Sequence, residues 1–289
     1  MATPMGLKDI LVHLDTTAQT PARLALAVAL AARHGAHLTG VHIIDIPPAS
    51  FFYGAAIPFL PAAPDEIVER MREDAQAAAV PVETAFRESV RRDGVEGEWR
   101  LAEGPGPATL ALHARYADVA VVGQPNPKGV QDGSDGSIPI TAVLGSGRPV
   151  LTVPYAGTFP VVGKRVLVAW NASREAARAV ADALPLLQAA EHVTILAINP
   201  KRGIGGQGGG VPAADIALHL ARHGVQAEAA HTVAKDISDG EALLSYAADI
   251  AADLIVAGAY GHSRVRETVF GGVTRTLLAE MTVPVLLSH

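Results

Sequence analysis

Two stretches of this chain repeat each other at matching offsets. The later stretch begins ADLIVAG at residue 252, and the earlier one begins ADVAVVG at residue 117. In each stretch a glycine follows an aspartate by five residues and precedes a proline by 26: Asp253, Gly258 and Pro284 in one, Asp118, Gly123 and Pro149 in the other. Agreement over a span of this length indicates two copies of one folding unit. Any functional site therefore has two candidate locations.

The repeat also suggests how the chain is divided. A chain of 289 residues is long enough for about two domains, and its content of 49% hydrophobic and 18% charged residues is typical of a soluble globular protein with a substantial core. We predict an N-terminal domain over residues 1–154, a linker over 155–162 and a C-terminal domain over 163–289.

Composition excludes several classes of function. A net charge of −6 argues against a nucleic-acid surface, which needs clustered lysine and arginine. Because there is no cysteine, disulfides, thiol nucleophiles and thiolate metal sites are excluded, and no other set of residues predicts a metal site. The N-terminal segment lacks a signal-peptide pattern, and the longest apolar run, roughly residues 24–32, is far shorter than the ~20 residues that span a bilayer. We expect a cytoplasmic protein without a nucleic-acid or membrane partner.

Short apolar strands alternate with helical segments in both copies. The predicted strand pairs are 9–15 and 165–171, 37–45 and 192–199, 99–102 and 227–233, the two strands that end at Gly123 and Gly258, and 149–153 and 284–287. Strands that are apolar throughout and alternate with helices indicate a parallel sheet covered on both faces. The predicted fold class is α/β, with two tandem doubly wound, Rossmann-like domains.

Polar residues and glycines follow the strands at the edge where such sheets bind ligands. In open parallel sheets ligands lie beyond the carboxyl ends of the strands, where the winding direction switches. Glycines let backbone N–H groups approach an anion closely, and a helix N-terminus adds favourable partial charge. A helix is expected from near Thr276, with a threonine before it that can cap it or donate to a ligand. The candidate residues of the second copy are Asn171, Ser173, Gly258, Gly261, His262, Gly271, Gly272, Val273 and Thr274. For His262, contact with a phosphate and a solvated loop position are both open.

The glycine spacing resembles that of the universal stress protein family, in its tandem two-domain members. The nucleotide-binding members of that family carry G-x2-G-x9-G-[S/T] after the fourth strand. Here Gly258, Gly261 and Gly271 match the pattern, and Gly272 stands where serine or threonine is usual. The resemblance covers nearly the whole chain and implies that this loop binds ATP or a related adenine nucleotide, which Mg²⁺ can accompany.

The same resemblance assigns two further positions in each copy. It implies that the residue ending the first strand meets the ligand and that the end of the second strand lines the adenine. These positions are Asn171 and Ile198 in the second copy, and Asp15 and Ile44 in the first. Asparagine in place of the family's aspartate keeps hydrogen bonding and removes a charge.

The first copy departs further from the pattern. Its loop keeps Gly123, Gly136 and Ser137, but Asn126 replaces the second glycine. Prolines flank that asparagine on both sides and remove backbone donors. The C-terminal copy is therefore the favoured nucleotide site, and the N-terminal copy is expected to be degenerate. Alternatively, the glycines persist only as turns between the fourth strand and its helix.

The fifth strand of each copy would be an exposed apolar edge that is prone to pair. The family resemblance implies that residues 149–153 and 284–287 pair with each other, which makes the chain an intramolecular pseudo-dimer. Association of whole chains into a further homodimer is left open.

Three functions remain open on the sequence. The leading one is a stress-response protein that binds an adenine nucleotide and acts as a sensor or binding module. A second is an interaction or structural protein without nucleotide, using the aromatic insertion at residues 47–64. A third is a slow ATPase. No paired carboxylates and no nucleophile with a positioned base can be named around the glycine loop, so the sequence does not support catalysis and no catalytic residue is predicted.

Overall fold

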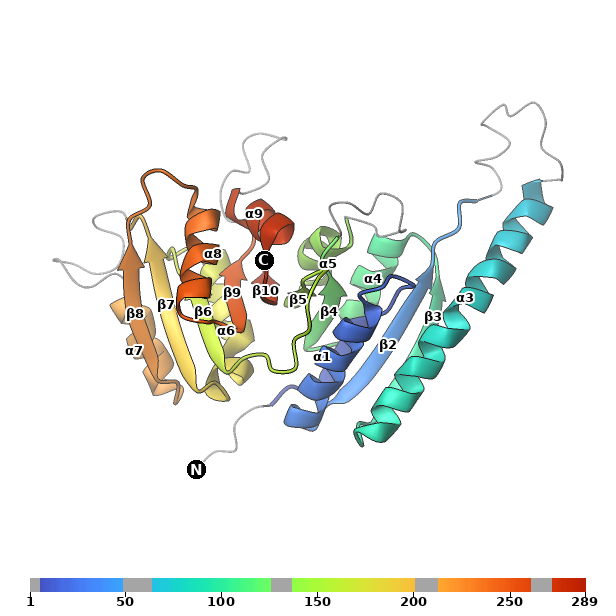
Figure 1. Cartoon of the computed structure of the whole chain (residues 1–289), viewed down its shortest axis with the longest axis horizontal. Coiled ribbons are helices and arrows are strands. Elements are labelled where there is room, and N and C mark those ends of the chain that lie inside the picture. Colours follow the sequence, from blue (N-terminus) through green and yellow to red (C-terminus); the bar gives the residue numbers. More distant parts are fainter. Residues whose placement is uncertain (1–5, 49–63, 126–136, 201–212, 261–271) are drawn as a thin grey trace.

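The ten strands of the described residues form one continuous sheet (Figure 1). The structure is a computed structural model that describes residues 6–48, 64–125, 137–200, 213–260 and 272–289. The strand order is β3-β2-β1-β4-β5-β10-β9-β6-β7-β8. In each half the strands are added first on one side of the starting strand and then on the other. The change occurs between β1 and β4 in the N-terminal half and between β6 and β9 in the C-terminal half. The predicted doubly wound α/β fold, present twice, is confirmed.

The two halves contain the same alternation of strand and helix. The N-terminal half consists of β1 (Asp9–His13), α1 (Thr20–His34), β2 (His37–Ile44), α3 (Pro64–Arg92), β3 (Gly97–Glu103), α4 (Gly106–Ala114), β4 (Val119–Gly123), α5 (Ile138–Ser146) and β5 (Val150–Val153). The C-terminal half consists of β6 (Arg165–Ala169), α6 (Arg174–Gln188), β7 (His192–Ile198), α7 (Ala214–Arg222), β8 (Ala227–Thr232), α8 (Asp239–Asp249), β9 (Leu254–Gly258), α9 (Gly272–Glu280) and β10 (Val285–Ser288).

The first strand of each half is two residues shorter than predicted. Asp15 and Asn171 were expected to end these strands, but β1 stops at His13 and β6 at Ala169. In both halves the side-chain oxygen accepts a hydrogen bond from the backbone N–H two residues on, Thr17 or Ser173, at 3.0 Å. Asp and Asn favour this turn because the side chain substitutes for a backbone acceptor. The turn places both residues in the loop above the sheet edge.

Helices cover both faces of the sheet, as its apolar strands require. Side chains of α1, α3, α6 and α7 pack on one face, where Phe86 and Leu186 are buried. Side chains of α4, α5, α8 and α9 pack on the other face, where Leu110 and Leu277 are buried. Alternate residues of each strand enter the two cores, as Ile10 and Leu11 of β1 do.

Antiparallel pairing of β5 with β10 joins the halves at the centre of the sheet. Val285 is opposite Thr152, and Leu287 is opposite Val150. The remaining strand pairs are parallel. The pairing of the two fifth strands is the one that the sequence predicted, and it removes two apolar edges from solvent.

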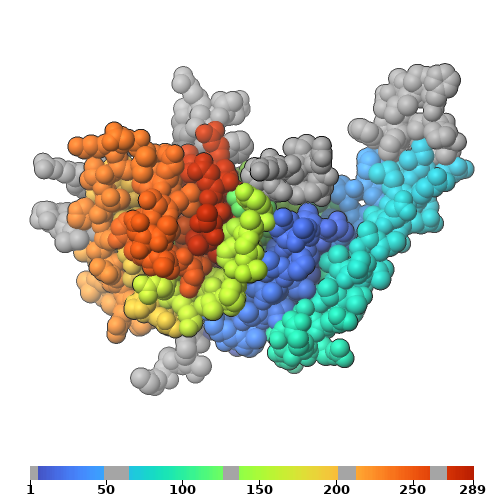
Figure 2. All heavy atoms as spheres, viewed as in Figure 1, coloured from blue at the N-terminus to red at the C-terminus, as the bar shows by residue number. Residues whose placement is uncertain are grey.

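The segment between the halves packs along their seam. Figure 2 shows it in yellow-green beside α1. The Arg33 guanidinium of α1 donates a hydrogen bond to the Val162 carbonyl at 2.6 Å, and Phe159 packs against the core. Among the described residues, no helix has the length and apolar character needed to cross a membrane.

A charge placed in the central strand pair should destabilise the whole chain. Val285 is fully buried, so Val285→Asp would bury an unpaired carboxylate and lower the free energy of unfolding by about 3 kcal/mol or more. The measurement is the thermal unfolding midpoint, with Val161→Asp as control because that valine is 43% exposed. Equal midpoints for the two variants would show that the strand pairing does not hold the halves together.

Candidate functional site

A pocket opens at the carboxyl ends of β6, β7 and β9, at the predicted switch point. The starts of α8 and α9 complete its wall. Its described lining consists of Ala169, Trp170, Asn171, Ser173, Ala176, Leu196, Ile198, Asp239, Leu243, Ala257, Gly258, Tyr260, Gly272, Val273 and Thr274. The pocket therefore has a polar, glycine-containing side at β9 and an apolar side at β7 and α8.

The candidate residues of the C-terminal half that the structure describes all line this pocket. They are Asn171, Ser173, Ile198, Gly258, Gly272, Val273 and Thr274. Three further candidates, Gly261, His262 and Gly271, lie outside the described residues. The sequence analysis did not select Trp170, Asp239 or Tyr260. Trp170 is next to Asn171, and Tyr260 lies between Gly258 and Gly261 in the sequence. Asp239 is at the start of α8, which is not part of the glycine pattern.

Packing requires a glycine at position 258, and this glycine also lines the pocket. A Cβ at this position would lie 2.5 Å from the Ala176 nitrogen and 2.5 Å from the Glu175 carbonyl carbon. Both atoms belong to the α6 backbone, so the clash could not be relieved by turning a side chain. The glycine thus allows β9 to approach the start of α6, which supports the alternative that some glycines of the pattern serve the turn.

Gly272 has no such packing requirement. It begins α9, is exposed, and a Cβ there would meet no atom of the described residues within 4 Å. The first N–H groups of a helix have no intrahelical acceptor and carry partial positive charge. At Gly272 these groups border the pocket. The side chain that is usual at this position in the family would therefore fit here without moving its neighbours.

Hydrogen bonds within the protein already engage two of the predicted hydroxyl groups. The Ser173 hydroxyl accepts from the Ala176 N–H at 3.1 Å and so caps α6. The buried Thr274 hydroxyl accepts from the Tyr260 N–H at 3.4 Å, and a hydroxyl that accepts can also donate. Tyr260 has a φ of 60°, an uncommon value for a residue with a side chain. Burial raises the pKa of its phenol to about 12.

The equivalent place in the N-terminal half is filled by an arginine. The Arg23 guanidinium lies 2.9 Å from the Asp15 carboxylate and is almost completely buried. A Cβ on Gly123 would collide with the same guanidinium. Arg23 therefore occupies the space between the loop after β1 and the glycine that ends β4. The sequence analysis missed this residue, although a single arginine in the apolar run TPARLALAVALAA was a detectable signal.

The other N-terminal candidates also have positions within the protein. Ile44 is buried at the end of β2, and Ser137 precedes α5 as its N-cap residue without a capping hydrogen bond from its side chain. Gly136 lies outside the described residues. Asp15 and Gly123 lie against the Arg23 side chain.

Burial and charge set the protonation of the groups around Arg23. Burial, with the nearby Arg23 charge, lowers the pKa of His13 from its usual 6.5 to about 3. Burial alone would raise the pKa of the Asp15 carboxyl, but Arg23, His13 and the hydroxyls of Thr17 and Thr20 together hold that pKa well below its usual range. At neutral pH His13 is therefore neutral, and Asp15 and Arg23 form an ion pair.

Comparison with known proteins agrees with this architecture. The model of the universal stress protein family matches residues 6–154 and 163–289. The universal stress protein of Archaeoglobus fulgidus DSM 4304 has a similar structure, with a TM-score of 0.70 and 16% identity over 97% of each chain. A universal stress protein structure from Pseudomonas aeruginosa UCBPP-PA14 is similar with a TM-score of 0.55 and 14% identity, over 98% of this chain and 93% of that one. At these identities the structures show the fold alone.

A curated relative matches over a shorter stretch. The universal stress protein Slr1230 of Synechocystis sp. is 46% identical over 46 residues, and the match spans 16% of each chain. The family match covers most of both halves, so the chain belongs to the universal stress protein family as a tandem, two-domain member.

The buried His13 should make stability depend on pH. In the folded state His13 stays neutral down to about pH 3, whereas in the unfolded state it binds a proton below its usual 6.5. Stability should therefore fall as pH decreases from 6.5 toward 3, by up to about 1.4 kcal/mol per pH unit from this group. The Asp15 carboxyl has an ordinary pKa of 3.8 in the unfolded chain and adds to the loss only below that value.

Urea unfolding at a series of pH values tests this dependence. His13→Asn should flatten the curve between pH 6.5 and 4 relative to the unmodified chain. The exposed His231→Asn is the matched control and should leave the slope unchanged. If His13→Asn and the control give the same slope, His13 is not held neutral in the folded protein.

Proposed function

We propose that the C-terminal half binds an adenine nucleotide and that the chain acts as a sensor or binding module in the stress response. The observation that carries this proposal is the pocket at the β6/β9 switch point, which Gly258 and Gly272 border. One side of the pocket is suited to phosphate and the other to a base. The proposed domain boundaries are those of the sequence prediction, with residues 155–162 as the linker.

The phosphate side is built from the start of α9. The N–H groups at Gly272 and Val273 and the Thr274 hydroxyl border the pocket there. A helix N-terminus favours an anion through these unpaired donors and through the helix dipole. Val273 is a useful member of this set because only its backbone, not its side chain, needs to meet a phosphate.

The base side is apolar. Leu196 and Ile198 of β7 and Leu243 of α8 line it, and such side chains pack against the flat face of an aromatic base. Asn171 lies between the two sides and can donate or accept a hydrogen bond. Among the described lining residues the one carboxylate, Asp239, lies on the base side. Any Mg²⁺ would therefore enter with the phosphates rather than be held by a carboxylate at the start of α9.

The same reasoning argues against nucleotide in the N-terminal half. A nucleotide there would have to displace the Arg23 guanidinium and break its ion pair with Asp15, whose side chain is 27% exposed. Arg23 itself is almost completely buried, so leaving its charge without this partner is unfavourable. We infer that this half serves as a fixed structural partner of the binding half.

The other functions stay predictions. The aromatic insertion at 47–64 lies mostly outside the described residues, and no described feature favours it as a contact surface. For a slow ATPase, the described pocket lining offers no second carboxylate beside Asp239 and no nucleophile with a positioned base. A nucleotide-binding module accounts for the pocket without a chemical step.

Restoring the family's hydroxyl at the start of α9 should strengthen binding. Gly272→Ser adds a donor in open space beside the proposed phosphates, and a hydrogen bond to a charged group contributes about 1.5–3 kcal/mol. We therefore expect ATP affinity to rise about tenfold or more in calorimetric titration. Gly272→Ala is the matched control and should bind no more tightly than the unmodified chain.

The same titrations can contradict the proposal. If neither the unmodified chain nor Gly272→Ser binds ATP at millimolar concentration, the pocket is not a nucleotide site. If Gly272→Ala binds as tightly as Gly272→Ser, any gain comes from the helix and not from a hydroxyl at the phosphate.

A further inference from the structure

The order of the strands determines which residues lie at each end of the pocket. Its floor runs from β9 through β6 to β7, because these strands are consecutive neighbours in the sheet. Gly258 and Gly272 lie at the β9 end, and Ile198 ends β7 at the other. A nucleotide with its phosphates at the start of α9 would therefore extend its base toward β7 and the start of α8. This direction depends on the proposed function.

A carboxylate is held at the base end of the pocket. Asp239 is the first residue of α8 and lines the pocket. The Asn199 side-chain amide donates a hydrogen bond to Asp239 Oδ1 at 2.7 Å. Among the described lining residues it is the one charged group, and its neighbours there are the apolar Ile198 and Leu243. A charged acceptor beside an apolar wall is suited to bind a donor on an otherwise apolar ligand.

Asn199 is itself fixed by the backbone around it. It has a φ of 47°, its N–H donates to the Thr232 carbonyl at 3.0 Å, and its side-chain oxygen accepts from the Ala234 N–H at 3.0 Å. With its oxygen bonded to Ala234, the amide is oriented so that its NH₂ group faces Asp239. The two hydrogen bonds thus determine which way the asparagine points and hold the Asp239 carboxylate.

The start of α8 is also capped and closely packed. Ser238 and Glu241 form a reciprocal capping box at this helix end. Gly240 is buried, and a Cβ there would lie 2.6 Å from Thr276 Cβ of α9. Absence of a side chain at Gly240 therefore lets α8 and α9 pack closely. The carboxylate at one end of the pocket and the helix N-terminus at the other are held at a fixed separation.

We propose that Asp239, positioned by Asn199, determines base specificity by accepting a hydrogen bond from the exocyclic amino group of adenine. An ionised carboxylate only accepts hydrogen bonds. It favours a base with an amino donor at the edge farthest from the sugar, and with a purine that lacks this group the carboxylate loses that hydrogen bond. A site that hydrogen-bonds one ligand group discriminates strongly against the analogue that lacks it.

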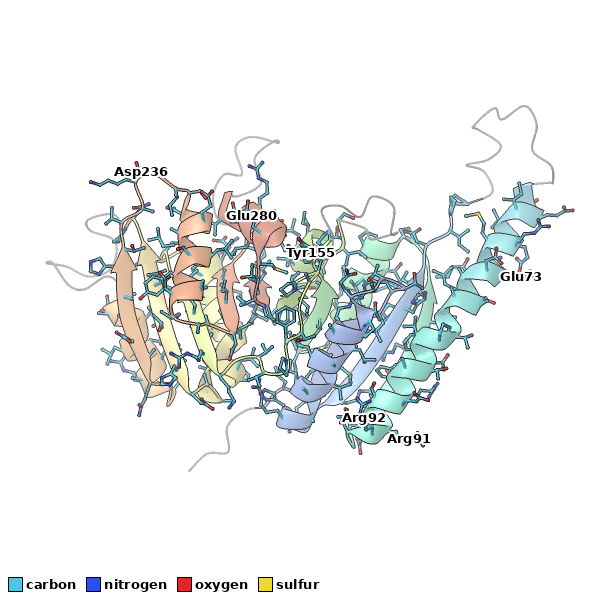
Figure 3. The ribbon with its side chains drawn as sticks, viewed as in Figure 1. Glu73, Arg91, Arg92, Tyr155, Asp236 and Glu280 are labelled. Carbon is cyan, nitrogen blue, oxygen red and sulfur yellow. The ribbon has the colours of Figure 1, made fainter. Side chains whose placement is uncertain are left out.

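The test compares three nucleotides on four proteins. ATP, purine riboside 5′-triphosphate, which lacks only the amino group, and GTP are titrated into the unmodified chain, Asp239→Ala, Asn199→Ala and Asp236→Ala. Asp236 is the matched control: it is exposed, lies on the β8–α8 connection just before Asp239 and is not among the lining residues (Figure 3). Thermal unfolding of each protein verifies that it is folded.

We expect the unmodified chain and Asp236→Ala to bind ATP about tenfold more tightly than purine riboside triphosphate. Asp239→Ala should bind both with the same affinity, and Asn199→Ala should reduce the preference. If ATP binds but its preference survives in Asp239→Ala, or if GTP binds more tightly than ATP, the role of Asp239 is wrong while nucleotide binding stands. If no nucleotide binds the unmodified chain, the proposed function itself fails.

Discussion

Backbone hydrogen bonds between β5 and β10 unite two similar halves in one sheet, and much of the remaining structure depends on them. They cover the apolar edge that each half would otherwise expose. They also bring the loop after β4 to α9, where the Gln124 side-chain NH₂ donates to the Leu278 carbonyl at 2.9 Å. The Gln124 oxygen accepts from the Tyr155 N–H at 3.0 Å, and Figure 3 shows Tyr155 at the seam. The helix that borders the pocket is thereby held from the N-terminal half.

The two halves differ at the carboxyl ends of their strands. In the C-terminal half Glu175 and the Ala176 nitrogen at the start of α6 close the space beside Gly258, and a pocket remains between β7 and α9. In the N-terminal half the long side chain of Arg23 crosses the corresponding space and pairs with Asp15. We propose that this buried cation beside Asp15 closes the N-terminal half to a ligand and leaves the C-terminal half as the binding half.

The sequence predicted the features that follow from local pattern and spacing. The doubly wound fold of each half and the position of Gly258 at the end of its strand follow from apolar runs and a repeated register, and the central strand pair was implied by the family resemblance. The sequence did not predict features that depend on where a side chain points. The path of Arg23 into the site and the approach of Asp239 to β7 arise only when separate elements pack together. Ser173 was predicted at the site, but its hydroxyl caps α6 because the nearest unpaired donor is the N–H three residues on.

We propose that one half of the chain is open to a nucleotide and that the other is filled by its own arginine. Native mass spectrometry of the nucleotide-stripped chain with excess ATP tests this claim most directly, because it counts bound molecules per chain. The account predicts one ATP per chain at saturation. Two molecules per chain would show that Arg23 does not close the N-terminal half, and none would show that the pocket between β7 and α9 is not a nucleotide site.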